Sequence, residues 1–149
     1  MLMSAVIFHL IDDTDPEAYW FYAAELCAQA VVDERMTYVV CANHAHVESF
    51  DEYLWGYRPD AFVPHTADPE DVEHAPLFLG IDPAAGGFAS VINLSGVPIE
   101  RVAEREQLDE VVDAQPANRD AARARWRDYQ AAGVKPQHRQ IVQVARDSE

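Results

Sequence analysis

Residues 4–11 read Ser-Ala-Val-Ile-Phe-His-Leu-Ile, and this segment is the clearest indication of the fold class. It is an apolar run of strand length, typical of a strand that is covered on both faces in a parallel sheet. Asp12-Asp13-Thr14 ends the run. Asp15-Pro16-Glu17 then combines a capping carboxylate, a first-turn proline and an acid at the positive end of a helix. Apolar residues at helical spacing extend this predicted helix to about residue 34.

The rest of the chain continues this alternation of strands and helices. A second apolar strand, Tyr-Val-Val-Cys, is expected at residues 38–41, and a second helix at residues 45–55. The alternation predicts an α/β fold, in which a single domain over residues 1–149 has a mostly parallel sheet flanked by helices. Residues 135–149 are interpreted as a C-terminal tail of uncertain order. The other expected elements are strands at residues 62–65 (at a sheet edge, because of Pro64), 77–81, 89–94 and 110–113, an exposed loop at 66–76, a short helix at 98–106, and a last helix at 116–132 that stops at Gly133.

The charge of the chain is strongly negative and unevenly placed. Of its 149 residues, 26 are Asp or Glu and 11 are Lys or Arg, which gives a net charge of −15. Such a surface repels phosphate backbones and anionic lipids, so binding of nucleic acid or of a membrane by the whole surface is disfavoured. Residues 1–100 hold 17 acids and two bases, whereas residues 119–139 hold six bases and two acids. The acidic body therefore carries one basic segment.

The cysteines and the N-terminal sequence point to a reducing compartment. The apolar run at residues 5–11 is too short to span a membrane, and no basic segment precedes it. Cys27 and Cys41 have no Cys-x-x-Cys motif or matching histidines, so buried free thiols are expected rather than a disulfide or a zinc site. We therefore expect a cytoplasmic protein.

The turn after the first strand is unsuited to a nucleotide. A phosphate in this position needs glycines for close backbone approach and a helix N-terminus that is free of negative charge. The chain has Asp12, Asp13 and Asp15 there, and it contains neither a Gly-x-Gly-x-x-Gly nor a Walker motif. The sequence thus predicts a nucleotide-binding-like (Rossmann-like) fold without a phosphate loop and without a cofactor.

Patterns for catalysis and metal binding are also missing from the sequence. His44 and His46 have no third ligand at a suitable spacing, and a surface pair is the simpler interpretation. No Gly-x-Ser-x-Gly motif occurs. We therefore assign no catalytic residue and no metal site, and we expect no enzymatic activity of the chain itself.

The last predicted helix carries the strongest functional signal. With about 100° between successive residues, Arg119 and Arg127 lie about 40° to either side of Arg123, and Trp126 lies about 60° from it. This stripe is either a solvated face that pairs with the acidic body or a binding surface. Trp126 favours the binding surface, because arginine forks next to the apolar area of a tryptophan are typical of interface hot spots.

The opposite side of the same helix is expected to pack against the sheet. Ala121, Ala122, Tyr129 and Ala132 share that side. Arg125 falls close to it, so we expect this arginine to pair with an acid or to reach solvent past its neighbours.

Four segments together have the pattern of a known family. They are the first strand ending in Asp-Asp; Leu54-Trp55, followed by Arg58-Pro59 and by Phe-Val-Pro-His at residues 62–65; Glu-Val-Val-Asp at residues 110–113; and Arg-Ala-Arg-Trp-Arg-Asp-Tyr-Gln-Ala-Ala-Gly at residues 123–133. In these segments, and over nearly its whole length, the chain resembles the chi subunit of the bacterial DNA polymerase III holoenzyme.

The resemblance implies a clamp-loader accessory protein that bridges two partners and binds no nucleotide. One partner is the psi subunit, which ties chi to the clamp loader. The other is the acidic C-terminal tail of single-stranded-DNA-binding protein, which ends in Ile-Pro-Phe-like residues. The family's tail site falls on Arg123, Trp126 and Arg127, with Trp126 in place of a tyrosine, and Trp55 matches a tryptophan near that pocket. Arg119 joins the expected tail site because it shares the helix stripe.

Phe62 lies in the segment that faces psi in the family, so we expect it to belong to an apolar psi-binding patch. Two alternatives to this adaptor function stay open. One is an α/β enzyme of unknown substrate, which would need a ligand pocket at the carboxyl ends of the strands. The other is a protein that binds single-stranded DNA directly.

Overall fold

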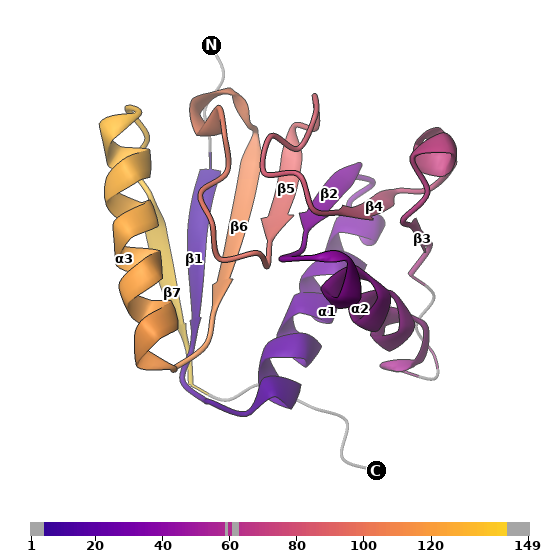
Figure 1. The fold of residues 1–149 in the computed structure, drawn as a ribbon, viewed down its shortest axis with the longest axis horizontal. Coiled ribbons are helices and arrows are strands. Elements are labelled where there is room, and N and C mark those ends of the chain that lie inside the picture. Colours follow the sequence, from indigo (N-terminus) through magenta and orange to yellow (C-terminus); the bar gives the residue numbers. More distant parts are fainter. Residues whose placement is uncertain (1–4, 59, 61–62, 143–149) are drawn as a thin grey trace.

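The computed structural model describes residues 5–58, 60 and 63–142. These residues form three α-helices, two short 3-10 helices and seven strands (Figure 1). In chain order they are β1 (Ala5–Ile11), α1 (Pro16–Val32), β2 (Thr37–Val40), α2 (His44–Gly56), β3 (His65–Thr66), a 3-10 helix (Pro69–His74), β4 (Leu77–Gly80), β5 (Ser90–Asn93), a 3-10 helix (Val102–Glu104), β6 (Gln107–Val112), α3 (Pro116–Ala131) and β7 (Gln137–Ile141).

The strands form one sheet with the order β3-β4-β2-β5-β6-β1-β7, and every neighbouring pair is parallel. The predicted α/β class, with a parallel sheet flanked by helices, is therefore confirmed. β3 lies at one edge, as Pro64 led us to expect, although Phe62 itself lies outside the described residues.

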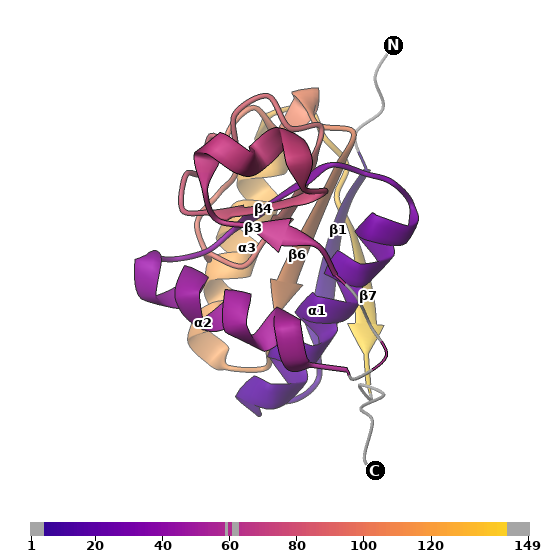
Figure 2. The same cartoon turned by 90° about the vertical axis from the view of Figure 1, so that its right-hand side faces the viewer.

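Two buried clusters cover the two faces of the sheet. One includes Phe50 of α2 and residues of α1, and the other includes Phe8 of β1 and Tyr129 of α3. Figure 1 shows α3 next to β7 and β1, with α1 and α2 on the other side of the strands, and Figure 2 shows the molecule from the side of α1 and α2. Helices α2 and α3 thus pack on opposite faces.

The helix boundaries follow from local chemistry. The Asp15 carboxylate accepts a hydrogen bond from Glu17 N at 3.0 Å and so caps α1, as the sequence predicts. Asn43 caps α2 in the same way through His46 N, at 2.9 Å. Gly133 follows α3 with a φ of 90°, a left-handed conformation that glycine adopts without strain.

The segment after α3 corrects the sequence analysis. Residues 137–141 form the edge strand β7, parallel to β1, where we expected a tail of uncertain order. The strand has no apolar run because it lies at the edge of the sheet and most of its side chains are exposed. Residues 143–149 lie outside the described residues.

Three smaller expectations were also wrong. A 3-10 helix at Val102–Glu104 replaces the helix expected at residues 98–106, because Arg101 takes a left-handed φ of 54° that interrupts a helix. The expected loop at residues 66–76 contains the 3-10 helix Pro69–His74. Ala121 and Ala132 are exposed, because α3 contacts the sheet along a narrower stripe that includes Ala122 and Tyr129.

Cys27 and Cys41 are buried free thiols, as predicted. Burial raises the pKa of the Cys41 thiol to about 12 and also raises the pKa of Cys27, so both thiols are protonated at neutral pH.

Candidate functional site

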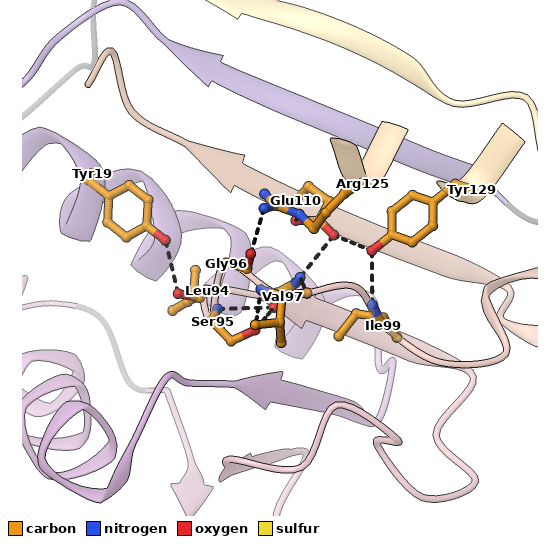
Figure 3. Close-up of polar contacts among 10 residues, drawn as sticks. Tyr19, Leu94, Ser95, Gly96, Val97, Ile99, Glu110, Arg125 and Tyr129 are labelled. Carbon is orange, nitrogen blue, oxygen red and sulfur yellow. Dashed lines mark hydrogen bonds and ion pairs between the residues drawn. The ribbon is translucent and has the colours of Figure 1, made fainter. Parts of the chain in front are cut away.

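A buried polar network fixes helix α3 to the sheet. Glu110 of β6 is fully buried, and its carboxylate accepts hydrogen bonds from Arg125 Nε at 3.0 Å and from the Tyr129 hydroxyl at 2.6 Å. Asn93 Nδ2 is a third donor, at 2.9 Å. Figure 3 shows Arg125 and Tyr129 meeting Glu110, with Arg125 Nη1 also donating to the Gly96 carbonyl at 2.8 Å. The expectation that Arg125 pairs with an acid is confirmed, and the acid is Glu110.

Burial dominates the electrostatics of this network. Desolvation raises the pKa of Tyr129, and the neighbouring Glu110 carboxylate raises it further, so the hydroxyl is a donor at neutral pH. Burial also raises the pKa of Glu110, while the Arg125 guanidinium and the hydrogen bonds to the carboxylate act in the opposite direction. These groups are satisfied only when α3 has one rotation about its axis. The network therefore fixes which side of α3 faces outward.

The outward side of α3 forms one wall of a cavity of about 340 Å³ between this helix, β1 and β7. Apolar side chains form its base, and arginines and aromatic rings form its rim. The lining residues are Phe8 and Leu10 of β1, Arg119, Ala122, Arg123, Trp126 and Arg127 of α3, and His138 of β7. The structure thus brings all four residues of the predicted helix stripe to one cavity.

Trp126 forms the aromatic wall of this cavity. Its half-buried ring has its centroid 5.2 Å from that of Phe8 and 6.0 Å from that of His138. Phe8 in turn packs on Tyr129, with 5.9 Å between ring centroids. The buried network thus holds Tyr129, which packs on Phe8, and Phe8 in turn packs on Trp126. An aromatic wall over an apolar base suits the side chain of a phenylalanine or isoleucine.

The three arginines of the cavity differ in how their guanidinium groups are engaged. Arg119 is half-buried and donates to the backbone carbonyls of Asp113, at 2.7 Å, and Ile11, at 2.9 Å, so it closes one end of the cavity. Arg123 is exposed and pairs with Asp120 at 2.8 Å. A surface pair of this kind is weak, about 0–1 kcal/mol, so Arg123 can exchange Asp120 for another carboxylate.

Of the three cavity arginines, Arg127 is the one whose charge is most available to bind a carboxylate. It is exposed, and within the described part of the chain no hydrogen bond or ion pair engages its guanidinium. An exposed guanidinium beside an apolar hollow has the geometry to fork a carboxylate whose neighbouring side chain enters the hollow.

Comparisons with known proteins identify the family. Residues 3–137 match the family model described as DNA polymerase III chi subunit, HolC. The chain belongs to this family. It is also 32% identical over 143 residues to DNA polymerase III subunit chi of Pseudomonas aeruginosa, an alignment that covers 95% of this chain and 100% of that protein. Membership in the chi family supports a role as an accessory subunit in DNA replication.

Trp55 is not near the cavity of this chi-family protein. It lies on α2, which packs on the other face of the sheet, and its ring centroid is 4.4 Å from that of His65. His65 is held in turn by Asp51, with 2.8 Å between His65 Nε2 and Asp51 Oδ1. Trp55 is 55% exposed. It is therefore separated from the four residues with which the sequence analysis grouped it.

Three cavity residues on the strands were absent from the predicted site, and Ala122, which was expected only to pack against the sheet, also lines the cavity. Phe8 and Leu10 share a face of β1, and strict alternation along that strand could have assigned them to the face that α3 covers. His138 had no such signal, because β7 is polar and was not recognised as a strand.

A second cavity, of about 470 Å³, lies where the enzyme alternative requires one, at the carboxyl ends of β5 and β6 and the starts of α1 and α2. Its two hydroxyl groups already have partners: Ser95 Oγ donates to Asn93 Oδ1 at 2.6 Å, and Tyr19 donates to the Leu94 carbonyl at 3.5 Å. His46 Nδ1 accepts from Ala42 N at 2.9 Å. The hydrogen bonds of the described residues thus do not pair a nucleophile with a base in this cavity.

The described residues also contain neither a group of metal ligands nor a membrane-spanning helix. In this part of the chain no three His, Cys, Asp or Glu side chains are grouped as metal ligands. None of its helices is long and apolar enough to cross a membrane.

Proposed function

We propose that this protein is a non-catalytic adaptor of the replicative DNA polymerase III holoenzyme. It links the clamp loader, through the psi subunit, to the acidic C-terminal tail of single-stranded-DNA-binding protein, and it acts in the bacterial cytoplasm without a cofactor. The observation that carries the proposal is the cavity beside α3, where an apolar hollow and available arginines occur together on a body of net charge −15.

The tail fits this cavity by complementary chemistry. Its terminal carboxylate is forked by Arg127, with Arg123 as the second cation, and its last apolar side chain enters the hollow beside Trp126. Acidic residues that precede the apolar end meet the remaining basic charge of residues 119–139. Arg119 has a different role, because its guanidinium is already bound to two backbone carbonyls. It shapes the end of the cavity.

The psi subunit is expected on a separate surface. Trp55 is a large exposed side chain on α2, a few residues before Phe62 in the chain, and it lies on the other face of the sheet from the tail cavity. We therefore group Trp55 with Phe62 in the psi-binding patch. Two separate surfaces allow both partners to bind at once, as an adaptor requires.

Isothermal titration with a synthetic acidic peptide ending in Ile-Pro-Phe tests the tail assignment. Arg127→Ala is expected to weaken binding by about 1.5–3 kcal/mol, the range for a charge-assisted bond whose partner is left unpaired. Arg58→Ala is the matched control, because this arginine pairs with Glu25, far from the cavity lining, and its loss should not change the affinity. Unchanged affinity in both Arg123→Ala and Arg127→Ala would overturn the assignment.

A gel-shift experiment with bare single-stranded DNA distinguishes the adaptor function from direct DNA binding. The adaptor function predicts no complex at moderate salt, because most of the surface is acidic. A complex with bare DNA in the absence of single-stranded-DNA-binding protein would favour the alternative instead.

A further inference from the structure

The edge strand β7 lies directly beside the tail cavity and has a side without a strand partner in the described part of the chain. It pairs with β1 on one side only, and the sheet order ends with it. Figure 1 shows β7 beside β1 at the end of the sheet that α3 covers, where Trp126 of α3 reaches His138 of β7. His138 of β7 is also part of the cavity wall. The free edge and the cavity therefore form one continuous surface.

The register of β7 shows which backbone groups point away from β1. Asp12 N donates to the Ile141 carbonyl at 2.9 Å, so the backbone of Ile141 faces β1. Because the direction of the N–H and C=O groups alternates along a strand, Arg139 also faces β1, whereas His138 and Gln140 present their N–H and C=O groups outward. An extended peptide alongside β7 would meet these two residues.

The charges near this edge select the kind of strand that pairs with it. Arg139 is exposed on β7, Lys135 is exposed just before it, and Arg127 lies on the adjacent rim of the cavity. A second copy of β7 would bring like charges together, which is unfavourable across a strand pair. An acidic peptide brings opposite charges to the same positions.

We propose that the acidic segment that precedes the apolar end of the tail binds β7 as an added strand, through the outward backbone groups of His138 and Gln140. The proposal rests on the proposed function, since it concerns the same tail and extends its site from the cavity to the sheet edge. Strand addition recognises the backbone of the peptide and not its sequence. The edge therefore tolerates variation among the acidic residues, while the cavity selects the terminal apolar side chain and carboxylate.

Two variants of Gln140 test the added strand, with the acidic peptide ending in Ile-Pro-Phe as the probe. Gln140→Pro removes an outward N–H and leaves the β1 ladder intact, because that N–H does not face β1. Gln140→Ala is the matched control, since it changes the side chain and keeps the N–H. Titration should show affinity reduced about fivefold to tenfold by the proline and unchanged by the alanine.

Amide hydrogen exchange provides a second measurement that does not depend on the folding of the proline variant. In the wild-type protein saturated with peptide, the amides of His138 and Gln140 should exchange more slowly than in the free protein. The Arg139 amide, which faces β1, is the internal reference and should change little.

The outcomes separate this proposal from the proposed function. If the His138 and Gln140 amides exchange equally with and without peptide, the added strand is wrong, while loss of binding in Arg127→Ala would leave the cavity assignment intact. If the wild-type protein binds no peptide, both proposals fail. If these amides gain protection with rising protein concentration and no peptide, the edge pairs with a second copy of the chain and the proposal is overturned.

Discussion

The inner and outer sides of helix α3 carry arginines in two physical states. Arg125, on the inner side, is 4% exposed and is held by Glu110 and the Gly96 carbonyl. Arg127, two residues later, is exposed on the rim of the cavity, and no described residue engages its guanidinium. The role of an arginine on this helix therefore depends on its angle about the helix axis and not on its residue type.

Removal of the inner arginine should have the largest effect. Arg125→Ala leaves the buried Glu110 carboxylate without its cation, which costs about 3–5 kcal/mol of unfolding free energy. Arg127→Ala should change the same quantity by no more than about 0.5 kcal/mol, because its side chain is a surface group. Urea unfolding of both variants gives the two values. A loss below about 1 kcal/mol in Arg125→Ala would show that the two sides do not differ as described.

Removal of a single hydroxyl group tests the difference between buried and exposed contacts with a smaller change. Tyr129→Phe removes the donor to Glu110 and the acceptor for Ile99 N, and both lost bonds are buried, so we expect a loss of about 1–3 kcal/mol in unfolding free energy. Tyr53→Phe is the matched control, since Tyr53 also donates to a carboxylate, that of Glu17, but at the surface. Its loss should stay below about 0.5 kcal/mol. Equal losses in thermal melts of the two variants would contradict the importance of burial here.

The smallest expected effect is the dependence of tail affinity on salt concentration. Charges exposed to water are screened over about 10 Å at 0.1 M salt and over about 3 Å at 1 M, whereas buried pairs are screened much less. Tail affinity should therefore fall as NaCl is raised, and it should fall less steeply in Arg127→Ala, which lacks one of the exposed charges. Titrations at several salt concentrations measure both slopes. Equal slopes in the two proteins would remove Arg127 from the electrostatic part of the site.

Periodicity was enough to predict most of α3. The angular positions of Arg119, Arg123, Trp126 and Arg127 put them on one stripe, and the structure brings them to one cavity. The same reasoning placed Arg125 near the buried side. It could not name Glu110 as the partner, because that contact depends on which strand passes beneath the helix, and the order of strands in a sheet is not encoded by local periodicity.

The parts that sequence reasoning missed have physical causes. An edge strand such as β7 buries little side-chain surface, so nothing in its composition distinguishes it from a polar tail. Trp55 was placed with the cavity by resemblance alone, and no local pattern in the sequence shows which face of the sheet its helix covers. The structure puts its helix, α2, on the face opposite α3.

The pairing of β7 with β1 also matters for synthesis and folding. Ile7 lies opposite Gln137, so β1 acquires its outer neighbour only after all the other described strands have been made. Contacts between such distant segments form late, since the chain must close a long loop first. A product that stops after α3 would lack His138 and one side of the cavity. Under the proposed function, such a product would therefore bind the acidic tail less tightly than a chain that includes β7.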